Sequence, residues 1–281
     1  GRPVTNHIND RVVVITGAAS GFGRLVANKT DPHGAKVVAS DVNEAELTAT
    51  LSAITDGGDT AVGVIAHVND REAMAALAAT AVDTYGAIDV MVNHAGVMPL
   101  GFYADHAQAG DAWDHCIDIN IKGVLNGIIA VHDQMITQGR GHIVNLSSIY
   151  GNYPVAGAAV YGATKAAVNV LSEALRQESQ GRIKVTTIRP TGVPGTALGN
   201  GIVNPAAISG ILGANQTAFM EAMGAVLGDN PPAGLGDPDS VEYFSLEPEL
   251  LADQIVYAIN QPWGVSIGDL TVRATGDRYI I

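Results

Sequence analysis

Two side chains near the middle of the chain have the types and spacing to move a proton. Tyr161 is followed four residues later by Lys165, and positions i and i+4 lie on one face of a helix. A lysine charge near a phenol favours the phenolate, so we expect the pKa of Tyr161 to fall from about 10 towards neutral pH. Such a phenol is a suitable proton acceptor for an alcohol.

A glycine-rich turn near the N-terminus could hold a diphosphate. Glycines at positions 17, 21 and 23 lie between an apolar strand that ends at Thr16 and an amphipathic helix. Glycine permits close approach of the diphosphate, and the helix N-terminus offers free N–H groups. The turn predicts a dinucleotide site, with an ordinary strand-to-helix turn as the alternative. Together with Tyr161 and Lys165, it indicates hydride chemistry.

Asp41 lies at the end of the second predicted strand, 20 residues after Gly21. An acidic residue at this place accepts hydrogen bonds from the adenosine ribose and repels a 2′-phosphate, so we predict NAD as the cofactor rather than NADP. No arginine follows Asp41 directly, which would have favoured NADP. The alternative role of Asp41 is the N-cap of the next helix, because Asp41–Glu44 resembles a capping box.

Composition excludes several classes of protein. The chain has 15 basic and 28 acidic residues and a net charge of −13, which disfavours binding to nucleic acid. No run approaches the roughly 18 apolar residues of a membrane helix, and we expect no leader and no membrane partner. Cys116 is the only cysteine, which excludes an internal disulfide and favours a cytoplasmic location. No Cys/His cluster has metal-ligand spacing, so no metal is expected.

Short β-branched runs alternate with longer amphipathic stretches along 281 residues. This pattern predicts βαβ units, and hence an α/β protein with a doubly wound parallel β-sheet, a Rossmann fold, in a single domain over residues 1–281. The predicted strands are Val12–Thr16, Lys36–Asp41, Thr60–His67, Ile88–Asn93, His142–Ser147, Lys184–Arg189 and Asp269–Arg273. The predicted helices are Phe22–Lys29, Glu44–Ile54, Arg71–Thr84, Trp113–Ile136, Tyr161–Ser179 and Glu249–Asn260.

Residues 196–247 interrupt this rhythm with a segment rich in Gly, Pro and Asn. A long insertion in a compact α/β domain is typical of a lid, so we predict that it covers the substrate. A disordered surface excursion is the alternative. The segment carries apolar residues that could cover a site: Ile202, Ile208, Ile211, Leu212, Phe219 and Met220.

The ordered set of motifs resembles the short-chain dehydrogenase/reductase superfamily, in its single-domain branch, over nearly the whole chain. The resemblance rests on Thr16–Gly23, Asn93–Gly96, Asn120, Asn145–Ser148, Tyr161–Lys165 and Arg189–Val193. It implies that Ser148 binds the substrate oxygen, Tyr161 transfers the proton, and Lys165 holds the nicotinamide ribose and lowers the pKa of Tyr161. Asn120 would anchor a water that connects Lys165 to solvent. A buried polar residue in a helix and a strand terminator are the alternatives for Asn120 and Ser148.

The resemblance also implies two sets of binding residues. The cofactor set is Gly17, Ser20, Gly21, Phe22, Gly23, Asp41, Val68, Asn93, Ala95, Gly96, Tyr161, Lys165, Pro190, Val193 and Thr196. The residues expected to line the substrate pocket are His94, Met98, Ile149, Tyr150 and Tyr153.

Three positions depart from the family pattern. His67 stands where relatives place an aspartate that contacts adenine, and Thr191 replaces a glycine after Pro190. His94 stands where a second asparagine is usual, and its role is open between packing, substrate contact and titration.

The sequence therefore predicts an NAD(H)-dependent oxidoreductase, an alcohol dehydrogenase or carbonyl reductase, that interconverts a secondary alcohol and a ketone with a hydrophobic substituent. The alternatives are a non-catalytic dinucleotide-binding sensor and a 3-hydroxy acid dehydrogenase, to which Pro248–Ile281 is weakly similar. An epimerase of the longer branch would need a different glycine spacing. The resemblance implies a homotetramer, and one helix carries a stripe that could pack against a second copy or face the core: Ala163, Ala167, Val170 and Ala174.

Overall fold

The computed structural model describes residues 4–58, 60–193 and 197–281. Its described strands form one seven-stranded sheet in the order β3-β2-β1-β4-β5-β6-β7, with every neighbouring pair parallel. The strands are β1 Val12–Thr16, β2 Lys36–Asp41, β3 Ala61–Ile65, β4 Val90–Asn93, β5 Gly141–Leu146, β6 Ile183–Pro190 and β7 Asp269–Val272. The predicted doubly wound sheet is confirmed. The strand order reverses between β1 and β4, the place where ligands bind in such folds.

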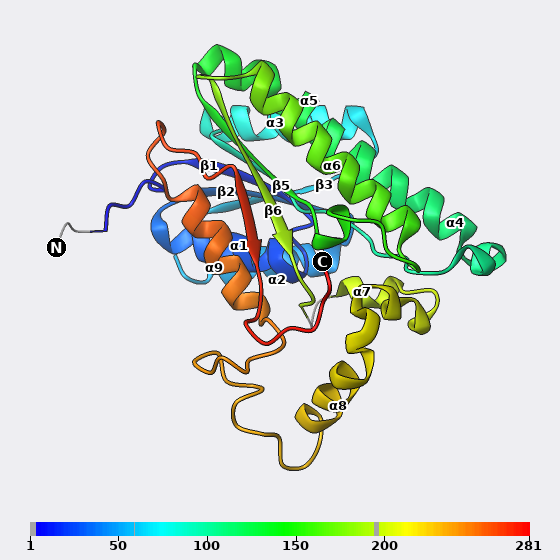
Figure 1. Cartoon of the computed structure of the whole chain (residues 1–281). Helices are drawn as coiled ribbons and strands as arrows, with labels where there is room; N and C mark the ends of the chain where they lie inside the picture. Colours follow the sequence, from blue (N-terminus) through cyan, green and yellow to red (C-terminus); the bar gives the residue numbers. More distant parts are fainter. Residues whose placement is uncertain (1–3, 59, 194–196) are drawn as a thin grey trace.

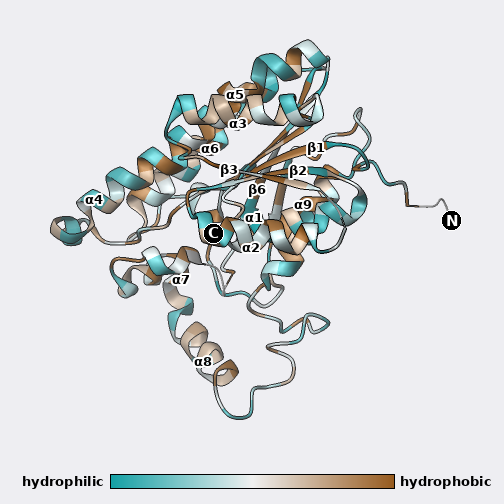
Figure 2. Cartoon of the chain, turned by 180° about the vertical axis from the view of Figure 1, so that it is seen from behind, coloured by the Kyte–Doolittle hydropathy of each residue, from teal (hydrophilic) through white to brown (hydrophobic). Residues whose placement is uncertain are grey.

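Helices cover both faces of the sheet (Figure 1). They are α1 Gly21–Thr30, α2 Glu44–Thr55, α3 Arg71–Tyr85, α4 His106–Ile117, α5 Gly123–Gln138, α6 Ala159–Glu178, α7 Ser209–Leu212, α8 Gln216–Val226 and α9 Pro248–Ile259. One buried cluster joins α1, α2 and α9 to the sheet, and a second joins α3, α5 and α6 to its other face. Figure 2 shows the strands as an apolar layer between helices whose outer faces are hydrophilic.

The sequence predicts a single helix over Trp113–Ile136, but the structure has three helical segments there. The α-helical segments α4 and α5 are joined by a π-helical turn over Asp118–Lys122, and α4 begins at His106, earlier than predicted. The wider turn brings Asn120 inward, where its side chain bonds the backbone of Val97. Insertions of this kind are frequent at functional sites.

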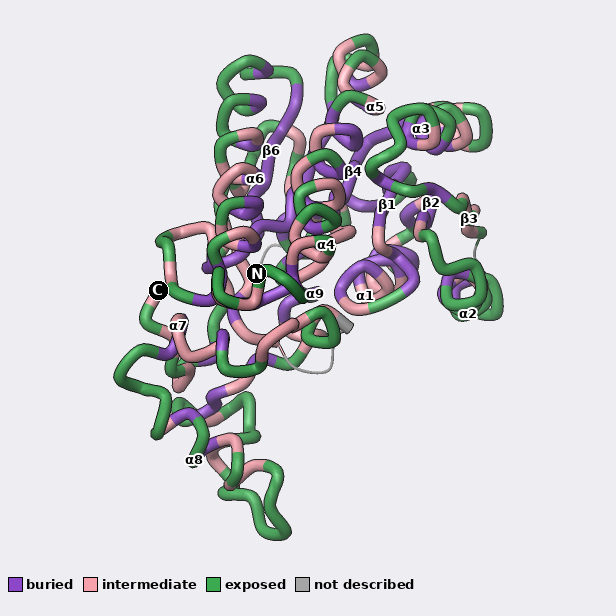
Figure 3. Tube along the Cα trace, turned by 90° about the vertical axis from the view of Figure 1, so that its right-hand side faces the viewer, coloured by how far each residue is buried: buried purple, intermediate pink, exposed green. Residues whose placement is uncertain are grey.

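The segment predicted as a lid is largely helical over its described residues 197–226, whereas 227–247 consists of turns and bends. It contains α7 and α8, and Ile211, Leu212 and Phe219 are buried in a third apolar cluster. Met220 points the other way and is 58% exposed. Figure 3 shows that burial is densest along the strands, whereas α8 and the chain around it are largely exposed. The helices α7 and α8 and their buried residues favour an ordered segment over a disordered excursion.

The small-residue stripe on α6 faces outward. Val170 is 70% exposed, whereas the core-facing residues of the helix include Tyr161, Lys165 and Val168. The stripe is therefore not part of the core. No helix in the described part of the chain is both long and apolar enough to cross a bilayer. The described residues also contain no group of three or more His, Cys, Asp or Glu side chains placed to hold a metal.

Candidate active site

The turn between β1 and α1 has the geometry that its glycines predict. Gly17 and Gly21 adopt left-handed backbone conformations, with φ of 66° and 55°. A side chain at Gly17 would lie 2.7 Å from Nδ1 of His94, and one at Gly23 would strike the carbonyl oxygen of Gly17. No side chain caps α1, and its first turn carries no carboxylate. The open helix N-terminus thus fits an anionic diphosphate.

The side chain of Asp41 binds this turn and does not cap α2. Its Oδ2 accepts a hydrogen bond from the backbone N–H of Ala19 (3.0 Å), and its Oδ1 accepts from those of Val42 (2.7 Å) and Asn43 (3.1 Å). The N-cap of α2 is Asn43, whose side chain accepts from Glu46 N. The capping interpretation of Asp41 is wrong, and its carboxylate lies at the end of β2 beside the glycine turn.

The end of β4 is attached to β1 by Thr16, the first residue of the glycine motif, to which the sequence assigned no role of its own. Thr16 Oγ1 accepts hydrogen bonds from the backbone N–H groups of His94 (3.2 Å) and Ala95 (3.3 Å). The side chain of Asn93 turns away from this edge and donates to Asn145 Oδ1 at 2.8 Å, deep in the fold. Successive strand residues point to opposite faces, so only the backbone of Asn93 is left for a cofactor, and its side chain is not a ligand.

Val68, in the loop after β3, is buried, and its carbonyl accepts a hydrogen bond from Asn126 Nδ2 at 2.9 Å. Its side chain packs where a Cβ at Gly123 would lie. The loop after β3 is thereby attached to α5.

His94 is a neutral side chain packed against the glycine turn. Its ring meets the edge of Phe22 with centroids 5.8 Å apart, and Nδ1 lies against Gly17. Burial, helped by the nearby charge of Lys165, lowers the pKa of His94 to about 4. Of the three roles left open for His94, this lowered pKa disfavours titration near neutral pH. Packing is observed, and His94 also lines the cavity described below.

Asn120 holds the chain that follows β4. Its Oδ1 accepts from Val97 N and its Nδ2 donates to Val97 O, both at 2.9 Å, and Nδ2 also reaches Thr164 Oγ1 at 3.1 Å. A Cβ at Gly96 would lie 3.3 Å from Asn120 Oδ1 and 3.6 Å from Lys165 Nζ. The amide and the ammonium therefore flank the same glycine.

The two adjacent serines after β5 have different surroundings. The hydroxyl of Ser147 donates to Asn169 Oδ1 (2.6 Å) and to the carbonyl of Lys165 (3.2 Å), so it binds α6. Ser148 Oγ accepts from Tyr150 N at 3.1 Å and is a hydrogen-bond partner of Tyr161. Ser148 is thus the serine that shares its surroundings with the tyrosine.

Tyr161 and Lys165 lie together, but the predicted fall in the pKa of Tyr161 is wrong for the protein without cofactor. Lys165 Nζ is 5.7 Å from the centroid of the Tyr161 ring and donates to the carbonyl of Leu146 at 2.9 Å. Burial raises the pKa of Tyr161 above its ordinary value, and the hydrogen bond from Ser148 offsets this only in part. Burial also lowers the pKa of Lys165 to about 8. Desolvation is the largest influence on the pKa of both groups.

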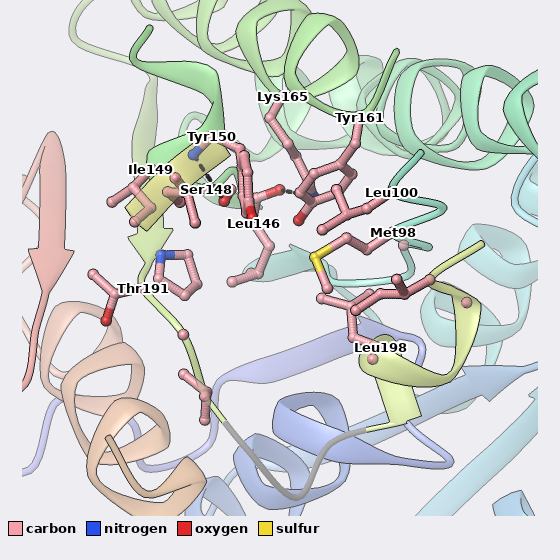
Figure 4. Close-up of a pocket in the computed structure, with 18 of the residues that line it drawn as sticks. Met98, Leu100, Leu146, Ser148, Ile149, Tyr150, Tyr161, Lys165, Thr191 and Leu198 are labelled. Carbon is pink, nitrogen blue, oxygen red and sulfur yellow. Dashed lines mark hydrogen bonds between the residues drawn. The ribbon is translucent and has the colours of Figure 1, made fainter. Parts of the chain in front are cut away.

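One cavity of about 520 Å³ joins the glycine turn to these side chains (Figure 4). Of the predicted pocket residues, it is lined by His94, Met98, Ile149 and Tyr150. Tyr153 is not among them: it follows the turn after Ser148 and is 68% exposed. Pro190, Thr191, Gly192 and Val193 also border the cavity, whereas Thr196 lies outside the described residues.

The cavity has further walls that the sequence analysis did not assign to it. They come from the segment after β6 and from the C-terminus: Leu198, Met223, Ser245 and Tyr279. Residues Ile202, Ile208, Ile211 and Phe219, predicted only as apolar cover, line it as well. Hydrophobicity marked the second group, but no motif marks Tyr279, which only the fold brings to the site.

Comparisons with known proteins agree with this geometry. The family model described as short chain dehydrogenase matches residues 11–206. An uncharacterised oxidoreductase of Staphylococcus saprophyticus is 35% identical over 268 residues, covering 95% of this chain and 97% of that protein. One from Listeria monocytogenes is 34% identical, with 97% and 99% covered.

Solved structures with the same fold include two that hold dinucleotides. A short-chain dehydrogenase/reductase from Burkholderia phymatum in complex with NAD is 26% identical, with a TM-score of 0.73 over 94% of this chain and 89% of that one. The closed form of a serine dehydrogenase complexed with NADP+ is 28% identical, with a TM-score of 0.76 over 96% and 97% of the two chains.

Proposed function

The chain belongs to the short-chain dehydrogenase/reductase family of oxidoreductases, and from this premise we propose that it interconverts a secondary alcohol and a ketone with NAD(H). One observation carries the proposal. A single cavity has the glycine turn at one end and Ser148, Tyr161 and Lys165 at its wall. A dinucleotide on the turn would therefore reach the same space as the proton-transferring groups.

The proposed roles follow from the contacts of each side chain. Tyr161 is the acid and base, because its phenol faces the cavity beside Ser148, which orients the substrate oxygen by a hydrogen bond. Lys165 holds the cofactor ribose, and Asn120 keeps Val97 and the end of β4 in place. When bound, an oxidised nicotinamide supplies the hydride acceptor and a positive charge. Because burial raises the pKa of Tyr161, the phenol needs such a charge to release its proton.

Asp41 supports NAD as the preferred dinucleotide. Its carboxylate lies at the end of β2 and is fixed by three backbone N–H groups. Two carboxylate oxygens offer about four acceptor positions, so one remains for ribose hydroxyls. A 2′-phosphate at this place would meet a fixed negative charge.

The cavity wall supports an uncharged, mainly apolar substrate. Among the described lining residues, Lys165 is the only one charged at neutral pH, and its Nζ already bonds a backbone carbonyl. Arg189 is held nearby by a bidentate pair with Asp269, at 3.1 and 2.6 Å. A 3-hydroxy acid would need a free cation for its carboxylate, so this alternative is less well supported, although a serine dehydrogenase shares the fold.

Residues 196–247 serve in this proposal as the substrate-binding lid, since apolar side chains of α7 and α8 form part of the cavity wall. We also propose a homotetramer that uses the outward stripe of α6, where Val170 is 70% exposed. Light scattering at micromolar concentration tests this: a monomer would contradict it.

The function is tested by following nicotinamide absorbance with hydrophobic secondary alcohols and ketones, each with NAD and with NADP. We expect turnover that the Tyr161→Phe variant lacks. Tight binding of NAD without turnover of any compound would instead identify a dinucleotide-binding sensor.

A further inference from the structure

The C-terminal segment returns to the cavity and is held there by several contacts. After β7, Arg273 pairs with Asp277 at 3.0 Å and donates to the carbonyl of Ile281 at 2.8 Å. The backbone N–H of Ile280 donates to Ile211 O in α7 at 3.0 Å (Figure 1). Asn215 Nδ2 donates to the carbonyl of Arg278, also at 3.0 Å. The segment is thus attached to the lid on both sides of Tyr279.

These contacts place the phenol of Tyr279 in the cavity wall. Its ring lies 6.1 Å from that of Phe219 in α8, and both residues line the cavity. A side chain at Gly192 would coincide with the hydroxyl of Tyr279. Glycine at position 192 is therefore required by the phenol, which approaches the backbone after β6.

Two other phenols, those of Tyr150 and Tyr161, line the same cavity as Tyr279. The rings of Tyr150 and Tyr161 meet edge to face with centroids 5.4 Å apart, and Tyr150 is also close enough to Tyr279 to interact with it electrostatically. Burial raises the pKa of Tyr279 to about 12 and that of Tyr150 further. Both hydroxyls are therefore neutral at physiological pH, and each can donate to or accept from an uncharged oxygen.

We propose that Tyr279 is a specificity-determining residue whose hydroxyl hydrogen-bonds a second oxygen of the substrate. The preferred substrates are then uncharged, mainly apolar diols, hydroxyketones or diketones, rather than compounds with a single oxygen. Tyr161 and Ser148 act on the reacting oxygen, while Tyr279, from the C-terminal segment, binds the second oxygen. A polar group in an apolar wall discriminates strongly, because a substrate without the matching oxygen leaves it unpaired.

This inference rests on the proposed function, and a matched set of alcohols tests both. The substrates are cyclohexanol and the 1,2-, 1,3- and 1,4-cyclohexanediols, with NAD, for the parent, for Tyr279→Phe and for Tyr257→Phe. Tyr257 lies on α9, is 57% exposed and does not line the cavity, so it is the control. We expect the parent to prefer at least one diol over cyclohexanol by about tenfold or more in kcat/KM.

Tyr279→Phe should lower kcat/KM for that diol by about 10–100-fold, while cyclohexanol stays within about twofold and the dissociation constant of NAD is unchanged. An equal loss for diol and cyclohexanol, a weaker NAD complex, or no loss at all would overturn the role of Tyr279 and leave the proposed function standing. Absence of turnover by the parent with every alcohol would overturn both.

Discussion

The sheet side and the cap side of the cavity hold their residues in different ways. On the sheet side, the functional groups are fixed by hydrogen bonds at strand ends, as for Asn120 on Val97 and Lys165 on Leu146. On the cap side, which is formed by α7 and α8, the cavity is lined by apolar groups such as Phe219 and Met223, which belong to a cluster packed by side-chain contact. Hydrogen bonds fix atoms for chemistry, whereas apolar packing shapes a space and is easier to alter.

The largest expected effect is therefore on the sheet side, at Tyr161. Tyr161→Phe keeps the ring and removes the proton acceptor, so turnover should fall by about 10²–10⁴-fold. Binding of NAD should survive, because the proposed ribose contact belongs to Lys165. Steady-state kinetics and NAD titration measure the two quantities, and Tyr257→Phe should change neither.

A Tyr161→Phe enzyme with more than about a tenth of parental turnover would contradict this assignment. The pH profile of oxidation adds a second readout. Since burial raises the pKa of the phenol, an apparent pKa below about 10 in the profile would show that a charge in the working complex overcomes burial.

The next largest effect is expected at Asp41, also on the sheet side. Asp41→Ala removes the fixed carboxylate beside the glycine turn, so NAD should bind more weakly and NADP more tightly. The ratio of kcat/KM for the two cofactors should shift by about tenfold or more. Asp41→Asn is the matched variant, because it keeps the size and loses the charge. If the parent already uses both cofactors equally, Asp41 does not select between them.

The sequence predicted the sheet side better than the cap side. The strands at Val12–Thr16 and Lys36–Asp41 have the predicted bounds, and Ser148 shares its surroundings with Tyr161 and Lys165 as the resemblance implied. Local patterns suffice there, because parallel strands bring their carboxyl ends to one edge. Such patterns do not predict which face of the sheet a side chain points to or how far its site is shielded from water. The inward direction of the Asn93 side chain and the raised pKa of Tyr161 could not be predicted for that reason.

On the cap side, hydrophobicity identified several residues that line the cavity but did not predict where in the fold they lie. The resemblance implies that Tyr153 lines the pocket, yet its side chain is exposed. Tyr279 reaches the cavity through contacts between distant segments, which only the fold reveals. The resemblance was misleading for Tyr153, and the sequence did not predict Tyr279.

Phe219 tests whether the cap acts on substrate alone. Phe219 is 7% exposed and lines the cavity, whereas its neighbour Met220 is 58% exposed and does not. Phe219→Ala should raise KM for an apolar substrate about tenfold, which corresponds to about 1.4 kcal/mol of lost contact, with kcat changed little. Met220→Ala is the control and should behave as the parent. A loss of NAD affinity in Phe219→Ala would mean that cap and sheet sides are not separable.

The smallest effect on turnover is expected at His94, where the sheet side meets the cavity. His94→Asn replaces a neutral packing residue, so kcat should stay within a few-fold of the parent, and the change should appear in stability instead. The pKa of His94 is about 4 in the fold and about 6.5 in the unfolded chain, because burial disfavours the imidazolium. Between these values the unfolded chain binds the extra proton. The stabilisation is therefore complete above about pH 6.5 and is lost as pH falls towards 4.

Urea unfolding at about pH 7 and about pH 4.5 should show that the parent loses about 1–2 kcal/mol more of its free energy of unfolding than His94→Asn. His142, buried with a pKa of about 3, is common to both proteins and cancels in the comparison. Equal losses in the two proteins would mean that His94 gains its proton as easily in the fold as in the unfolded chain. In that case titration of His94 near neutral pH would again be open.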